Sequence, residues 1–116
     1  MGIPRLSEFE RDLKKLLKRF HSLEEDLTTF EKVLRLNPRS PQWPRISNLG
    51  LEYPEVYKVT KFACKSLKGR GAKSGIRLVF AYFPDKDLVE MVEIYFKADD
   101  EKEDRQRILA RYSQCS

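Results

Sequence analysis

Hydrophobic residues recur at helical spacing through the first third of the chain. They fall three or four positions apart with charged residues between them, which is typical of amphipathic helices. The pattern predicts one helix over residues 8–20 and a second over residues 22–36, ended by the Asn37-Pro38 pair. Because the connection between the two helices is so short, we expect them to form an antiparallel hairpin. Its apolar stripe must pack against another part of the chain. The repeating apolar positions are Phe9, Leu13, Leu16, Leu17, Phe20, Leu23, Leu27, Phe30, Val33 and Leu34.

The pattern changes after a loop over residues 37–54, which is rich in proline. β-Branched and aromatic residues then fill three segments, at residues 56–65, 75–83 and 88–97, and predict strands. A turn joins the last two segments into a hairpin, and residues 100–112 follow as a final helix. A chain of 116 residues is long enough for one modest core.

This order of elements predicts a single α+β domain over residues 1–116. In it, the N-terminal helical hairpin packs on a small curved antiparallel sheet of three to four strands, and a short C-terminal helix follows. Helices on one face leave the other face of the sheet open. Alternation along the strands then places Arg77, Glu93, Tyr95 and Lys97 together on the open face.

Charge narrows the choice of partner. The formal net charge is +5, and residues 56–84 contain seven basic side chains and no acidic one. The excess therefore belongs to one stretch of the chain and favours a polyanion such as a nucleic acid. Glycines alternate with cations in the connection that holds Lys68, Arg70 and Lys73, so the backbone there can approach a phosphate chain closely.

Cysteine and histidine usage argues against a metal centre. The chain has two cysteines, Cys64 and Cys115, without a CxxC pair, and a single histidine, His21. A structural zinc site needs four such ligands, so we expect no metal and no cofactor. Unpaired thiols, together with the lack of any apolar run of membrane-spanning length, predict a cytoplasmic protein with no membrane partner.

The residues that carry the charge also resemble a known family. The pattern Lys65-x-x-Lys68-Gly69-Arg70-Gly71-x-x-x-Gly75-Ile76-Arg77, continued by an apolar strand, a turn and Glu93-Ile94-Tyr95-Phe96-Lys97, resembles the RelE/ParE superfamily of toxin–antitoxin toxins. The resemblance implies an endoribonuclease, or mRNA interferase, that cleaves messenger RNA at the ribosome and is neutralised by an acidic antitoxin protein. It places Arg77 at the scissile phosphate, Lys65 and Lys68 near the family's strand lysines, and Lys97 at the family's basic residue.

Metal-independent RNA cleavage uses the 2′-hydroxyl as the nucleophile, so the site must move protons and stabilise a phosphorane. We assign phosphorane stabilisation to Arg77, whose guanidinium matches two phosphate oxygens. Tyr95 or Glu93 is the candidate for proton transfer, with Lys97 as a candidate acid. Lys65 and Lys68 complete the catalytic set and hold the RNA backbone in place. The further residues expected to bind RNA are Lys61, Arg70 and Lys73.

Two alternatives remain open on the sequence alone. The first is a non-catalytic ParE-like toxin that poisons DNA gyrase, in which Arg77 and the lysines are surface cations. The second is a simple nucleic-acid-binding module without toxicity. Glu93 has a plain alternative too, as the partner of a neighbouring lysine, and Tyr95 could stack on a base.

Overall fold

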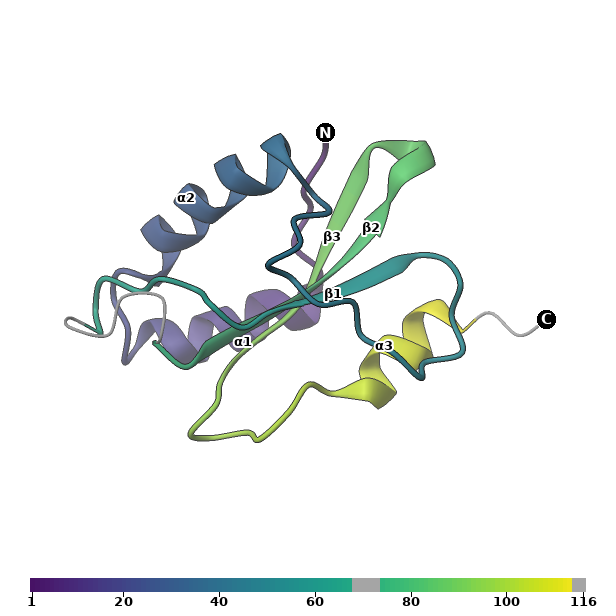
Figure 1. Cartoon of the computed structure of the whole chain (residues 1–116). Coiled ribbons are helices and arrows are strands. Elements are labelled where there is room, and N and C mark those ends of the chain that lie inside the picture. Colours follow the sequence, from purple (N-terminus) through teal and green to yellow (C-terminus); the bar gives the residue numbers. More distant parts are fainter. Residues whose placement is uncertain (68–73, 114–116) are drawn as a thin grey trace.

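The computed structural model describes residues 1–67 and 74–113. The helices are α1 (Ser7–Leu17), α2 (Leu23–Leu36) and α3 (Arg105–Tyr112), and a short 3-10 turn, η2 (Pro84–Lys86), joins two strands. The strands are β1 (Glu55–Val59), β2 (Ile76–Phe83) and β3 (Leu88–Phe96). The predicted α+β class, with an N-terminal helical pair, a sheet and a short final helix, is confirmed (Figure 1).

The three strands form one antiparallel sheet in the order β1-β2-β3. The N-terminal segment of the chain runs alongside the first half of β3. There the Val89 amide donates to the Gly2 carbonyl at 2.9 Å, and the Leu6 amide donates to the Met91 carbonyl at 3.1 Å. This segment covers the outer edge of β3 only as far as Met91, so the second half of that edge needs other partners.

The sheet has an apolar core on each face. Residues of β2 with even numbers, from Ile76 to Phe80, pack against α1 and α2. On the other face, Val79 and Ala81 pack against Ile108 of α3 and Leu49 of the loop before β1. Figure 1 shows α3 on the opposite side of the sheet from the helical pair. The expectation of a fully open second face is therefore wrong, because α3 and the loop cover the part of it around Val79 and Ala81.

A β-bulge in β3 changes which side chains share a face. Val79 pairs with Glu93 while Phe80 pairs with Met91, so Val92 is an extra residue without a partner on β2. Simple alternation would put Val92 on the same face as Ile94. Instead Ile94 lies in the core under α1 and α2, and Val92 lies in the core under α3.

Three predicted elements stop or start at least three residues inside their predicted bounds. The helix predicted over residues 8–20 ends at Leu17. The strand predicted over residues 56–65 ends at Val59. Beyond it a side chain replaces the backbone partner, since Ser74 Oγ donates to the Phe62 carbonyl. The helix predicted over residues 100–112 begins at Arg105, where the Asp104 side chain accepts the Arg107 amide at 3.0 Å. The preceding segment turns back on the end of β3 instead.

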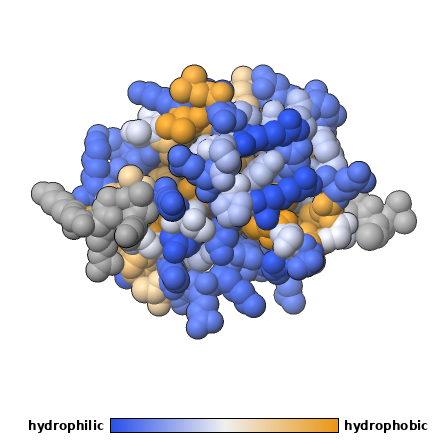
Figure 2. Space-filling model, viewed as in Figure 1, coloured by the Kyte–Doolittle hydropathy of each residue, from blue (hydrophilic) through white to orange (hydrophobic). Residues whose placement is uncertain are grey.

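Some apolar side chains remain at the surface near the end of α2 (Figure 2). There the exposed fraction is 87% for Leu36 and 50% for Val33.

No helix formed by the described residues is long and apolar enough to cross a membrane.

Candidate nucleic-acid site

Arg77 occupies the second position of β2, directly opposite Tyr95 on β3. Strand alternation turns its side chain away from α1 and α2, since Ile76 and Leu78 on either side of it lie in their core. The side chain is half-buried, and its guanidinium donates to the Thr60 carbonyl just beyond β1. Arg77 therefore lies at the end of the sheet where β2 begins, outside both apolar cores.

Tyr95 lies under the cover of the second face, contrary to the expected exposure. Its exposed fraction is 4%, and its phenolic oxygen is buried without a hydrogen-bond partner among the residues that the structure describes. Burial raises the pKa of the Tyr95 phenol, although the nearby Lys58 ammonium acts against that rise. The phenol therefore stays protonated at neutral pH, which suits a donor better than a base or a stacking platform.

Lys58 on β1 is the cation next to this phenol. It pairs with Val79 in the sheet register, so its side chain lies on the same face as Arg77 and Tyr95. Its Nζ atom forms an ion pair with Glu103 at 2.9 Å, and the Glu103 side chain is 7% exposed. Arg77, Lys58 and Tyr95 thus come from three adjacent strands, with Glu103 beside Lys58.

Glu93, two residues before Tyr95 on β3, is also buried, with an exposed fraction of 6%. Its carboxylate accepts the Asp104 amide at 2.9 Å and forms no direct ion pair among the described residues. Burial raises the pKa of Glu93 to about 7, although the hydrogen bond from Asp104 and the charge of Arg107 oppose the rise. A carboxyl group with this pKa can both accept and release a proton at neutral pH.

The raised pKa of Glu93 predicts a pH-dependent cost to stability. The folded state binds a proton at this carboxyl more tightly than the unfolded chain, in which the pKa of the group is 4.5. The stabilisation that comes from protonated Glu93 is therefore fully present below pH 4.5. It is lost as the pH rises through about 7. Glu93→Gln should therefore raise the free energy of unfolding by up to about 3 kcal/mol above pH 8 and change it little at pH 4.5.

Urea unfolding of both proteins between pH 4.5 and 8.5 measures this difference. The matched control is Glu52→Gln, because Glu52 is an exposed glutamate in a loop. Parallel pH profiles for wild type and Glu93→Gln would contradict the assignment.

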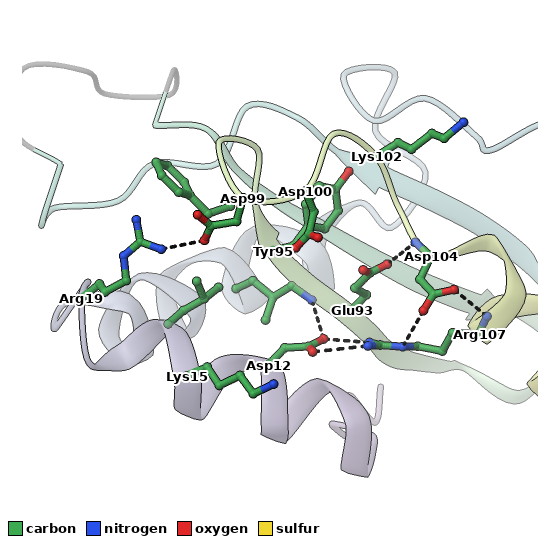
Figure 3. Close-up of a pocket in the computed structure, with 13 residues that line it drawn as sticks. Asp12, Lys15, Arg19, Glu93, Tyr95, Asp99, Asp100, Lys102, Asp104 and Arg107 are labelled. Atoms are coloured by element: carbon green, nitrogen blue, oxygen red, sulfur yellow. Dashed lines mark hydrogen bonds and ion pairs between the residues drawn. The ribbon is translucent and has the colours of Figure 1, made fainter.

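A polar cavity of about 510 Å³ opens beside Glu93 and Tyr95, between α1, the end of β3 and residues 97–104 (Figure 3). Arg19 and Asp99 close one end of it with an ion pair at 2.6 Å. Lys15 and Lys102 extend along its rim without an ion-pair partner in the described part of the chain. The lining residues are Asp12, Lys15, Leu16, Arg19, Glu93, Ile94, Tyr95, Phe96, Asp99, Asp100, Lys102, Asp104 and Arg107.

An ion pair forms the far wall of this cavity and completes the edge of β3. Asp12 on α1 accepts the Ile94 amide at 3.3 Å, and Arg107 on α3 donates to the Val92 carbonyl at 3.1 Å. The two side chains also bind each other, with Arg107 Nη1 2.7 Å from Asp12 Oδ2 (Figure 3). Together they take the place of a strand partner along the edge that the N-terminal segment leaves uncovered.

The other predicted site residues are more scattered. Lys65 pairs with Glu25 of α2 at 2.6 Å and has no described contact with Arg77. Lys61 is exposed beside a second cavity of about 260 Å³ under α2. Lys97 is exposed just beyond β3, and its amide donates to the Gly75 carbonyl at 2.8 Å, at the same end of the sheet as Arg77. Lys68, Arg70 and Lys73 lie outside the described residues.

Sequence reasoning did not single out Lys58 or Glu103. Lys58 belongs to the basic stretch, but the predicted strand gave no register, so nothing placed it beside Tyr95. Glu103 lies 45 residues further along the chain, within a segment predicted to be helical. The one available signal was strand alternation: Val59 is apolar and faces the core, so its neighbour Lys58 faces the opposite side of the sheet.

In the described residues, no group of three or more His, Cys, Asp or Glu side chains could hold a metal ion. The arrangement instead offers a guanidinium, an ammonium and a protonated phenol on one sheet face, with a carboxyl of pKa about 7 beside them. These groups can bind phosphate oxygens and exchange protons.

The arrangement of a helical pair on one face of a small antiparallel sheet, with a short C-terminal helix on the other, is a RelE-like fold. The chain is similar to the crystal structure of the isolated E. coli RelE toxin, with a TM-score of 0.53 and 19% sequence identity over 95% of each chain. A free-state structure of an E. coli RelE variant with two arginines replaced by alanine gives a TM-score of 0.48 and 21% identity over 86% of each chain. No family model matches the chain. No curated protein sequence matches it either. The likeness to the isolated toxin, at 19% identity, concerns the fold alone.

Proposed function

We propose that this chain is the toxin of a toxin–antitoxin pair, a cytoplasmic endoribonuclease that cleaves messenger RNA with Arg77 at the scissile phosphate. The observation that carries the proposal is the position of Arg77 on a RelE-like fold. It lies outside the apolar cores, opposite Tyr95, on a sheet face that also holds Lys58.

The reaction that these groups suit is a transesterification. The 2′-oxygen attacks the adjacent phosphorus, the bond from phosphorus to the 5′-oxygen breaks, and a 2′,3′-cyclic phosphate forms. Arg77 binds two non-bridging oxygens and stabilises the charge that develops on the phosphorane. This role asks for a guanidinium held in place but open to solvent, and a half-buried Arg77 bonded to the Thr60 carbonyl meets both conditions.

Two proton transfers complete the reaction, one from the 2′-hydroxyl and one to the departing 5′-oxygen. Glu93 is suited to accept a proton, because its pKa of about 7 leaves a large ionised fraction at neutral pH. The Tyr95 phenol keeps its proton and can donate a hydrogen bond to a phosphate oxygen, but its oxygen is buried. Lys97, exposed near Arg77, is therefore the candidate donor to the departing 5′-oxygen. Lys61, Lys65, Lys68, Arg70 and Lys73 contribute salt-dependent affinity for the RNA.

The proposed partners follow from this chemistry. Messenger RNA, presented by the ribosome, is the substrate. The antitoxin is an acidic protein, because a chain with a net charge of +5 concentrated in one stretch is masked by a complementary acidic segment. No cofactor takes part, because the substrate supplies its own nucleophile.

Induction in a bacterial host tests the proposal. Wild-type protein should stop growth and shorten the half-lives of messenger RNAs, whereas Arg77→Ala at the same protein level should permit growth. Arg11→Ala, which removes an exposed arginine of α1, is the matched control and should behave as the wild type.

Each alternative gives a different result. Growth arrest with a DNA-damage response and intact messengers would identify a gyrase poison. Normal growth with wild-type protein would leave only a nucleic-acid-binding module. Either outcome would reject the ribonuclease proposal.

A further inference from the structure

The Glu103 carboxylate lies where two cations converge. Lys58 Nζ from β1 is 2.9 Å from one of its oxygens, and Arg105 Nε from α3 is 3.3 Å from the other. The Glu103 side chain is 7% exposed, whereas those of Lys58 and Arg105 are 23% and 40% exposed. One buried carboxylate therefore binds two partly exposed cations, and the site stays open to solvent on the cation side.

The Tyr95 phenol adjoins the same group of charges, and the charges of Lys58 and Glu103 both act on it. Its oxygen is buried beside the Lys58 ammonium, which can only donate, and its own O–H has no acceptor among the described residues. Buried polar groups in folded proteins nearly always have a partner. A phenolic O–H without an acceptor at this position indicates a site that is complete only when a further acceptor is present.

A carboxylate is an incomplete occupant of this site. Lys58, Arg105 and Tyr95 offer an ammonium, a guanidinium and a phenolic O–H, which are all hydrogen-bond donors. Each oxygen of the Glu103 carboxylate faces one cation, and in this position neither oxygen accepts from the phenol. A phosphate group offers a third oxygen and tetrahedral geometry, so it can accept from the phenol as well.

We propose that Lys58, Arg105 and Tyr95 form a binding site for a phosphate group of the RNA backbone, which Glu103 occupies in the free protein and leaves when RNA binds. The inference rests on the proposed function for the identity of its ligand, while the site itself rests on the contacts of Glu103. Glu103 lies between β3 and α3, outside every helix and strand, so a local shift of the segment before α3 frees it.

Removing the competing carboxylate should tighten RNA binding. The probe is a single-stranded 2′-O-methyl RNA oligomer, which lacks the nucleophile and cannot be cleaved, and its Kd is measured by fluorescence anisotropy at several salt concentrations. In Glu103→Gln one more phosphate contact forms without competition. The slope of the logarithm of the association constant against the logarithm of the salt concentration should therefore be steeper than that of the wild type by about 0.7. That slope corresponds to binding about fivefold tighter at 0.1 M salt.

The matched control is Glu101→Gln. It removes the same charge from the same segment, but Glu101 is exposed and has no ion-pair partner among the described residues. Its salt dependence should equal that of the wild type. Adding Lys58→Met to Glu103→Gln should remove the gain, because the site loses its ammonium. Circular dichroism confirms folding of each variant, and Glu103→Ser replaces Glu103→Gln if that variant does not fold.

The outcomes separate the site from the proposed activity. Equal slopes for the Glu101 and Glu103 variants, a gain that survives Lys58→Met, or no binding by any variant would overturn the site. A gain at Glu103 without messenger cleavage by the wild type would keep the phosphate site and reject the ribonuclease. Cleavage without that gain would reject the site alone.

Discussion

Arg77→Ala should lower the rate of RNA cleavage by the purified protein by a factor of about 10² to 10³, which is the effect of removing one donor aimed at a developing oxyanion. Single-turnover cleavage of a defined RNA, with and without ribosomes, measures this rate. The cleavage rate of Arg77→Lys should fall between those of the wild type and Arg77→Ala. The lysine keeps the positive charge but lacks the paired donors that match two phosphate oxygens.

The fold should survive this substitution. The described hydrogen bond of the Arg77 side chain is to the Thr60 carbonyl, at the partly exposed end of the sheet. Loss of one such bond costs about 1 kcal/mol of unfolding free energy. Arg11→Ala again serves as the control. Cleavage by Arg77→Ala at the wild-type rate would remove Arg77 from the mechanism, and a rate that fell only in step with unfolding would make its role structural.

The largest effect on stability should come from the Asp12–Arg107 pair. Arg107→Met should lower the free energy of unfolding by about 2 to 4 kcal/mol, because it leaves Asp12 without its cation and the Val92 carbonyl without its donor. Asp12→Leu should be similarly destabilising, since it removes the nearest carboxylate of Arg107 and leaves the Ile94 amide without its acceptor, although Glu8 remains 3.4 Å from Arg107. The side chains are 21% and 16% exposed, so water can replace the lost partner only in part.

A double-mutant cycle separates this pair from its surroundings. The combined variant Asp12→Leu with Arg107→Met should be less destabilised than the sum of the single variants, because no unpaired charge remains. The control is Lys65→Met, which breaks the Lys65–Glu25 pair whose side chains are 64% and 68% exposed, and should leave the urea midpoint unchanged. Additive single effects would show that the two residues act independently.

The sequence determined most of the local structure of this protein. The helical repeat of apolar residues and the β-branched segments predicted every helix and strand in the observed order. The bounds were less accurate, since the strand predicted over residues 56–65 ends at Val59 and the helix predicted over residues 100–112 begins at Arg105. Local signals are enough here because helical periodicity and strand alternation depend on neighbours within about four positions. The same alternation placed Arg77 and Tyr95 on one face, and the count of charges located the basic stretch.

Only the tertiary structure decided what covers that face. α3 and the loop before β1 pack on it. As a result Glu93 and Tyr95, which were expected to face solvent, are buried among apolar residues. The bulge at Val92 shifted one strand by a residue, and alternation cannot anticipate such a shift. The contacts that shape the site join residues far apart in the chain, with Lys58 and Glu103 separated by 45 positions and Asp12 and Arg107 by 95. A sequence pattern records which side chains are charged, but which charges meet depends on how the elements pack.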